Sequence, residues 1–123
     1  MTDKQRTGAL GEALAKKHLQ ELGLTVVAES FRHGRVELDL IARRADGCLI
    51  FVEVKTRRGL GYGHPSGAVS VTKEKKMARA AAAYMQRVNH QWEVRFDIIS
   101  VLIAKDGSYE LEHLEDAFFP GLF

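Results

Sequence analysis

The feature that most restricts the fold of this chain is a pair of apolar segments separated by a very short turn. Residues Arg35–Arg43 (RVELDLIAR) and Cys48–Thr56 (CLIFVEVKT) have the apolar and β-branched composition of strands, and Asp46 and Gly47 lie between them. Two strands joined by so short a turn pair as an antiparallel hairpin. The sequence therefore predicts a β-hairpin near the middle of the chain.

The segments that flank the hairpin predict an α/β fold. A helix is expected over 4–22, where apolar residues recur at helical spacing before Gly23, and a second helix over 72–88. Further strands are expected over 24–31 and 92–103, a short edge strand over 109–113, and a loop over 57–67. The order is α-β-β-β-α-β-(β), and the second helix makes a right-handed crossover between parallel strands. We therefore expect a mixed sheet flanked by helices.

Length and composition predict one globular domain over residues 1–123, because 46% of the residues are hydrophobic. No apolar run approaches the roughly 18 residues of a membrane helix, so no membrane partner is expected. The first ten residues lack the apolar core of a secretory signal, which favours the cytoplasm. The single cysteine, Cys48, excludes an internal disulfide framework and a thiolate-rich zinc site.

The charges are unevenly distributed, although the formal net charge is only +2. Residues 55–79 contain seven basic side chains and one acidic one, whereas residues 106–123 contain five acidic side chains and no Lys or Arg. One interpretation is a face that binds a polyanion, with a repelling surface elsewhere. The other is an ordinary solvated loop and helix face.

The turn length decides which side chains oppose one another across the hairpin. A two-residue turn sets Asp39 opposite Val54, with mismatched faces. A three-residue loop, Ala45–Gly47 with a left-handed Gly47, instead sets Asp39 opposite Glu53. This second register also sets Glu37 opposite Lys55 and Ile41 opposite Phe51. It gathers one apolar face, formed by Val36, Leu38, Leu40, Ala42, Ile50, Val52 and Val54, so the pattern favours the three-residue loop.

Two opposed carboxylates are costly unless something neutralises them. Directly paired side chains have Cβ atoms about 5 Å apart, and two charges at such a distance repel by about 3 kcal/mol at an effective dielectric constant of ~20. A cation or a shared proton between Asp39 and Glu53 would remove this cost, and hard oxygen ligands favour Mg²⁺ or Mn²⁺. The alternative is that both carboxylates extend into water and pair with Arg43, Lys55 or Arg57.

Asp39, followed after 13 intervening residues by Glu53-Val54-Lys55, resembles the (P)D…(D/E)xK signature of restriction-endonuclease-like nucleases. Five blocks in order (GEALAKKHL, VELDLIA, FVEVKTR, TKEKKMARAA and VRFDIIS) resemble the YraN-type family of small bacterial proteins, which is similar to Holliday junction resolvases. The resemblance implies a restriction-endonuclease-like α-β-β-β-α-β core. Two positions depart from the family pattern, which has a glycine where this chain has Val36 and an asparagine where it has Ser30.

The resemblance also implies roles for particular residues. Asp39 and Glu53 would be metal ligands, with the Val54 carbonyl as a third, and Lys55 would be the catalytic lysine. Glu12 would be an accessory acid near the metal, although it could equally be a boundary glutamate paired with Lys16. Glu37 is a further candidate metal ligand. Resolvase-like relatives suggest a homodimer.

Basic residues beside this constellation are candidates for contacts with nucleic acid. Lys73, Lys76 and Arg79 are near the start of the second predicted helix, where positive charge opposes the helix dipole, which favours a phosphate-binding role. Arg57 and Arg58, which follow Lys55, are assigned to the same role. The five histidines show no metal-binding spacing and are expected at the surface. Asp97 could be a peripheral acid near the site, but a structural role as a partner of Arg95 or of a backbone donor is favoured.

Three functions remain open from the sequence. The first is a divalent-metal-dependent endonuclease that acts on DNA, with a preference for structured or branched DNA, because a two-carboxylate site beside a lysine suits phosphodiester hydrolysis. The second is a nucleic-acid-binding module with little or no catalysis. The third is a protein-interaction domain whose basic surface meets an acidic partner.

Overall fold

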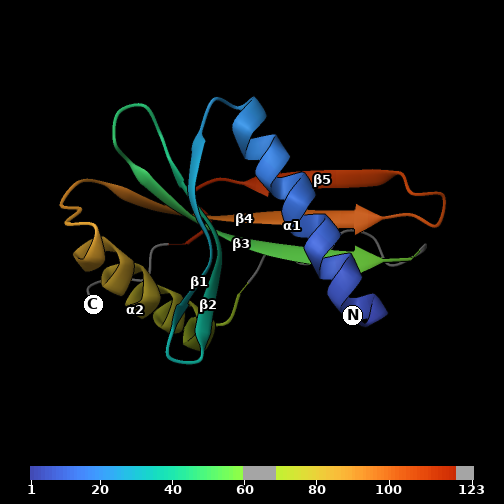
Figure 1. Ribbon diagram of the computed structural model, residues 1–123, viewed down its shortest axis with the longest axis horizontal. Helices are drawn as coiled ribbons and strands as arrows, with labels where there is room; N and C mark the ends of the chain where they lie inside the picture. The colour runs from blue at the N-terminus through green and yellow to red at the C-terminus, as the bar shows by residue number, and fades with distance from the viewer. Residues whose placement is uncertain (60–68, 119–123) are drawn as a thin grey trace.

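The computed structural model describes residues 1–59 and 69–118, which form a five-stranded sheet with one helix on each face (Figure 1). The elements are α1 (Asp3–Glu21), β1 (Thr25–His33), β2 (Val36–Arg43), β3 (Leu49–Arg58), α2 (Val71–Arg87), β4 (Val94–Ile103) and β5 (Tyr109–Leu114). Most of the predicted loop over 57–67 lies outside the described residues. Neither of the two helices in the described part of the chain is long and apolar enough to cross a membrane.

The sheet is mixed, as the sequence predicts. Its strand order is β1-β2-β3-β4-β5, and α2 connects β3 to the parallel β4, whereas every other neighbouring pair is antiparallel. The predicted order α-β-β-β-α-β followed by an edge strand is therefore confirmed.

Two apolar clusters hold the helices on the sheet. On one face, Ala15 and Leu19 of α1 pack on alternate residues of the central strands, such as Ile50 and Val52. On the other face, Met77 and Tyr84 of α2 pack on the intervening residues, such as Phe51. Because side chains alternate along a strand, both faces of the central strands are apolar and buried.

The hairpin between β2 and β3 has the predicted register. The Arg44 amide donates to the Cys48 carbonyl at 2.9 Å, and Ile41 lies opposite Phe51. Gly47 adopts a φ of 96°, the left-handed conformation that the three-residue loop requires.

The N-terminal half of β2 does not follow the prediction that its apolar residues all lie on one face of the sheet. Val36 and Leu38 pack in the cluster under α2, whereas Leu40 and Ala42 pack under α1. The strand therefore changes face at Asp39, between Leu38 and Leu40. The cause lies in the pairing with β1, which has a register shift between Val26 and Ala28 and a left-handed Ser30 (φ 50°) between the residues that pair with Leu38 and Leu40.

The left-handed φ of Ser30 favours particular residue types at this position. A left-handed φ is tolerated by asparagine and glycine better than by most residues. Ser30 therefore adopts this conformation at some cost, and the asparagine that the family resemblance leads one to expect here would adopt it more readily.

Helix α1 approaches β3 closely because one of its buried positions is a glycine. A Cβ atom added at Gly11 would overlap the side chain of Thr56, with Cγ2 at 2.7 Å and Cβ at 2.8 Å. One turn earlier, a Cβ atom at Gly8 would have no neighbour within 4 Å. Packing therefore requires a glycine at position 11 but not at position 8.

We expect Gly11→Ala to lower the free energy of unfolding by about 1–3 kcal/mol, because the methyl group must push α1 away from β3. Gly8→Ala is the matched control on the same helix and should raise the free energy of unfolding by about 0.5–1 kcal/mol through helix propensity. Urea unfolding measures both. Equal stability of the two variants would contradict the close approach of α1 to Thr56.

Candidate functional site

The site begins where β2 separates from β3. Residue pairing between the two strands continues only as far as Leu40 and Val52. The next ladder position on β3 is not filled by a backbone carbonyl, because the Val54 amide donates to Asp39 Oδ2 at 2.8 Å. The register that opposes Asp39 and Glu53 is therefore present, but the strands diverge before these two residues pair. A carboxylate takes the place of a backbone acceptor.

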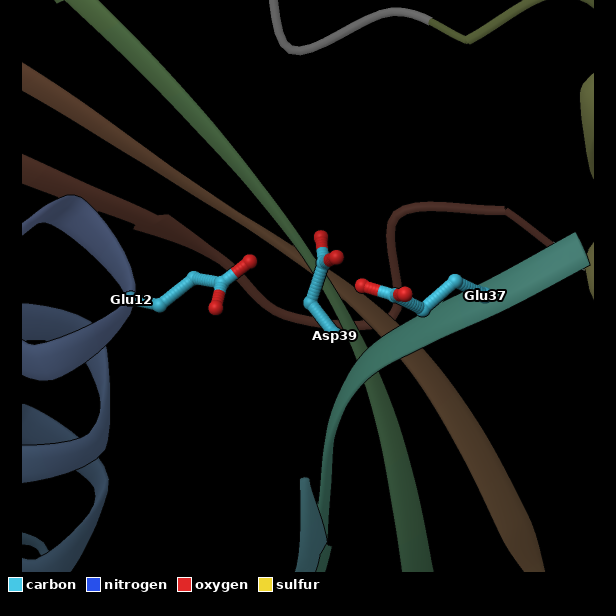
Figure 2. Close-up of side chains that lie close together, drawn as sticks. All are labelled: Glu12, Glu37 and Asp39. Atoms are coloured by element: carbon cyan, nitrogen blue, oxygen red, sulfur yellow. The ribbon is translucent and has the colours of Figure 1, made fainter. Parts of the chain in front are cut away.

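Three carboxylates meet at this point of divergence. Glu12 reaches in from α1, and Glu37 and Asp39 from β2, and one oxygen of each lies within 4.8 Å of the others (Figure 2). All three residues are half-buried. The change of face in β2 turns Glu37 and Asp39 towards α1, so the structure brings Glu12 to Asp39 as the resemblance implies.

Burial and the neighbouring acids raise the pKa values of Asp39 and Glu12. Burial, and then the charge of Glu53, raise the pKa of Asp39 to about 7, against the opposing hydrogen bond from the Val54 amide. Burial and the charge of Glu37 raise the pKa of Glu12, while a hydrogen bond with Asp39 lowers it. Asp39 and Glu12 therefore hold protons more tightly than isolated carboxyl groups do.

Glu53 lies on β3 beside the cluster, and only one of its two carboxylate oxygens has a partner among the described residues. Its side chain is 14% exposed, and Oε1 lies 3.5 Å from Nζ of Lys73 at the start of α2. Oε2 is buried and has no hydrogen-bond partner among the described residues. A buried carboxylate oxygen without a partner is costly, and a cation is one of the groups that would satisfy it.

Glu37 and Lys16 form ion pairs with other residues than the sequence suggests. β2 has separated from β3 before Glu37 and Lys55 could lie opposite each other, and Glu37 pairs with Arg32 of β1 at 3.0 Å. Lys16 does not pair with Glu12, because it reaches Glu29 at 2.9 Å. Glu12 is therefore left to the acidic cluster.

The basic residues lie on two sides of the acids. Lys73 contacts Glu53 from α2, and Lys76 and Arg79 are exposed on the same helix. On the other side, Arg57 and Arg58 are exposed at the end of β3 and line a cleft of about 420 Å³ between this strand and α1. The cleft is lined by Lys4, Thr7, Gly8, Glu12, Val54, Lys55, Thr56, Arg57 and Arg58.

The sequence reasoning overlooked the contribution of α1 to this cleft. Lys4 and Gly8 precede Glu12 at intervals of four residues, which places all three on the same helix face. This spacing is the signal that could have assigned Lys4 and Gly8 to the site once Glu12 was a candidate.

Asp97 is placed away from the cluster and has its full complement of partners. It accepts hydrogen bonds from Arg95 at 2.8 and 2.9 Å, from His113 Nε2 at 2.7 Å and from the Asp116 amide at 3.0 Å. Burial alone would raise the pKa of Asp97, but these hydrogen bonds outweigh burial and hold it below its usual range. The predicted pairing with Arg95 is confirmed.

The expectation that every histidine lies at the surface is wrong for His113. Its side chain is only 8% exposed, because Nε2 contacts Asp97 and Nδ1 lies 3.0 Å from His18 Nε2. His64 lies outside the described residues.

Fold and site together define a small α/β protein with a carboxylate cluster where two interior strands of a mixed sheet diverge. The sequence matches the uncharacterised protein family UPF0102 over residues 11–101. This chain therefore belongs to the UPF0102 family, which confirms the resemblance to YraN-type proteins.

Relatives in this family match over nearly the whole chain. A UPF0102 protein from Chlorobaculum tepidum is 42% identical over 127 residues, covering 98% of this chain and 98% of the relative. One from Rhodococcus opacus is 41% identical over 112 residues, covering 90% and 94%. One from Bacteroides thetaiotaomicron is 38% identical over 123 residues and covers both chains completely.

A solved structure, SfsA of Pyrococcus furiosus in complex with Ca²⁺, is also similar, at 18% identity and a TM-score of 0.39. The alignment covers 92% of this chain and 64% of that one. This degree of similarity does not support transferring chemistry to the present chain.

The raised pKa of Asp39 makes stability depend on pH in a specific direction. The folded protein holds this proton up to about pH 7, whereas the unfolded chain releases it near the ordinary value of 3.8. The folded state therefore binds more protons in this range, and stability falls as pH rises from about 4 to about 7. Asp39→Asn removes this pH-dependent loss of stability. At pH 8, without divalent metal, we therefore expect the free energy of unfolding of the variant to exceed that of the wild type by about 1–3 kcal/mol.

Thermal unfolding in EDTA across this pH range measures the effect, and the gain should shrink towards pH 4. Asp46→Asn is the control of opposite sign, because hydrogen bonds from Arg44 and from the Cys48 amide lower the pKa of Asp46 to about 2. If Asp39→Asn were less stable than wild type at pH 8, burial and the neighbouring acids would not destabilise the ionised form of Asp39 as inferred.

Proposed function

We propose that this protein is a divalent-metal-dependent endonuclease that hydrolyses phosphodiester bonds of DNA, with a preference for structured or branched DNA, in the cytoplasm. The observation that carries the proposal is the convergence of Glu12, Glu37 and Asp39 beside Glu53, whose Oε2 has no partner among the described residues. The raised pKa values of Glu12 and Asp39 and the unsatisfied buried oxygen of Glu53 fit a site built for a cation.

The donor set is composed of hard oxygen atoms, which suits Mg²⁺ or Mn²⁺. Asp39 and Glu53 would hold the ion, with the Val54 carbonyl as a third ligand. This carbonyl lies on the edge of β3 that faces Asp39, because the N–H and C=O groups of one strand residue point to the same side and the Val54 amide already donates to Asp39. Glu37 is a further ligand and Glu12 an accessory acid.

When bound, the cation supplies charge neutralisation at a phosphate and an activated water molecule. The chain's own residues position the substrate around it. Lys55 lines the cleft together with Glu12. It would orient the nucleophile or stabilise negative charge that develops on the phosphate. Arg57 and Arg58 on one side and Lys73, Lys76 and Arg79 on the other would contact the phosphate backbone.

The test is cleavage of supercoiled plasmid and of synthetic branched DNA in Mg²⁺ or Mn²⁺. Asp39→Asn and Lys55→Ala should each lower the rate by about 10²-fold or more, since each removes a group that acts on the reacting phosphate. Glu21→Gln is the matched control, because Glu21 is an exposed carboxylate at the end of α1, away from the cluster.

Calorimetric titration with Mn²⁺ separates the metal site from the reaction. Wild type and Glu21→Gln should bind Mn²⁺, and Asp39→Asn should not. Cleavage that persists in Asp39→Asn would overturn the assigned site. Salt-dependent DNA binding without cleavage would identify a nucleic-acid-binding module instead, and absence of DNA binding at low salt would exclude both nucleic-acid functions.

A further inference from the structure

Gly8 is a glycine that the fold does not require. It lies within α1, its φ is not in the left-handed region, and a Cβ atom at this position would meet nothing within 4 Å. Alanine would favour the helix more than glycine does. Gly11 shows the contrast, because there the packing of Thr56 leaves no room for a side chain.

Gly8 lines the cleft between α1 and the end of β3. A helical position without a side chain allows another group to approach the helix backbone closely. The absence of a side chain at Gly8 keeps the cleft open at its middle, between Lys4 and Glu12 on the same helix face.

The ends of the cleft are fixed by contacts between α1 and β3. Near its entrance, Arg58 Nε donates to Thr7 Oγ1 at 2.6 Å, and Thr7 Oγ1 donates to the Asp3 carbonyl at 2.9 Å. Further along, Gly11 packs on Thr56. These contacts between α1 and β3 hold the two elements in place on either side of the cleft, so the cleft does not depend on exposed side chains alone.

The groups that line the cleft suit a phosphodiester backbone. Lys4 and Arg57 have no ion-pair partner within the described residues, and both line the cleft. No strand among the described residues pairs with the edge of β3 beyond Val52 on this side, and the alternation of the ladder directs the Thr56 amide to this edge. Cationic side chains and a backbone N–H are the groups with which proteins contact nucleic-acid phosphates.

We propose that this cleft holds one nucleotide of an unpaired nucleic-acid strand, with its phosphate against Lys4, Arg57 and the helix backbone at Gly8. A volume of about 420 Å³ is that of a small-ligand site, which suits a single nucleotide and not a base-paired duplex. Because Glu12 and Lys55 form part of the same lining, the strand would pass directly from this cleft to the acidic cluster. The inference rests on the proposed nuclease function and specifies the form of its substrate.

Gly8→Leu tests the cleft without changing its charge, because the side chain fills the space beside the helix. Ala9→Leu is the matched control, one residue along on an exposed position of the same helix. The probe is a short fluorescein-labelled single-stranded oligodeoxynucleotide, measured by fluorescence anisotropy in Ca²⁺ with unlabelled duplex as competitor. Wild type and Ala9→Leu should bind the single strand at least about tenfold more tightly than the duplex, and Gly8→Leu should lose this preference.

Two further measurements exclude a merely structural effect. Gly8→Leu should have a melting temperature no lower than wild type and should retain the heat of Mn²⁺ binding, which shows that the fold and the proposed metal site are intact. Lys4→Ala should reduce the salt dependence of single-strand binding by about one unit of slope, whereas Lys17→Ala, an exposed lysine elsewhere on α1, should not.

The possible failures are distinguishable. If wild type cleaves DNA but Gly8→Leu keeps the single-strand preference of Ala9→Leu, or if wild type prefers duplex, the cleft inference is overturned and the proposed nuclease stands. If wild type binds no DNA of either form, the proposed function fails and the inference fails with it.

Discussion

The hydrogen bond from the Val54 amide to Asp39 Oδ2 is the interaction on which the site depends. A side-chain carboxylate takes the place of a backbone acceptor from β2, so β2 and β3 separate where their backbone pairing would otherwise continue. The opening uncovers one edge of β3 and leaves room for Glu53 and Lys55 to line a site. It also anchors Asp39 among other acids, because the bond holds its carboxylate to β3.

A second constraint acts from the opposite side of the opening. The close packing of Gly11 on Thr56 brings α1 against the uncovered end of β3, and this approach carries Glu12 into the cluster one residue later in the helix. The bent β1–β2 pair supplies Glu37 and Asp39 by changing the face of β2 at the level of Ser30. Two elements that are distant in sequence, α1 and β2, thus place three carboxylates within 4.8 Å of one another.

Much of this arrangement could be read from the sequence. The order of elements, the three-residue loop and the pairing of Ile41 with Phe51 follow from periodicity and turn chemistry, which are local. The face of Val36 and Leu38 could not be derived in the same way, because it depends on the left-handed Ser30 in the neighbouring strand. The expected placement of Glu37 opposite Lys55 was wrong for a related reason: the pairing of β2 with β3 ends at Leu40 and Val52 and does not continue past Asp39.

The contrast between two carboxylates shows that the strain at the site is specific to it. Asp97 is fully buried and accepts hydrogen bonds from Arg95, His113 and a backbone amide, so this fold can satisfy a buried acid completely. Glu53, on the strand beside it, retains a buried oxygen without a partner among the described residues, next to acids of raised pKa. Local rules are broken in natural proteins chiefly where function requires it. The unsatisfied oxygen of Glu53, the left-handed Ser30 and the edge of β3 beyond Val52, with which no described strand pairs on this side, all adjoin one opening in the sheet. This coincidence is the reason for placing the proposed site at that opening.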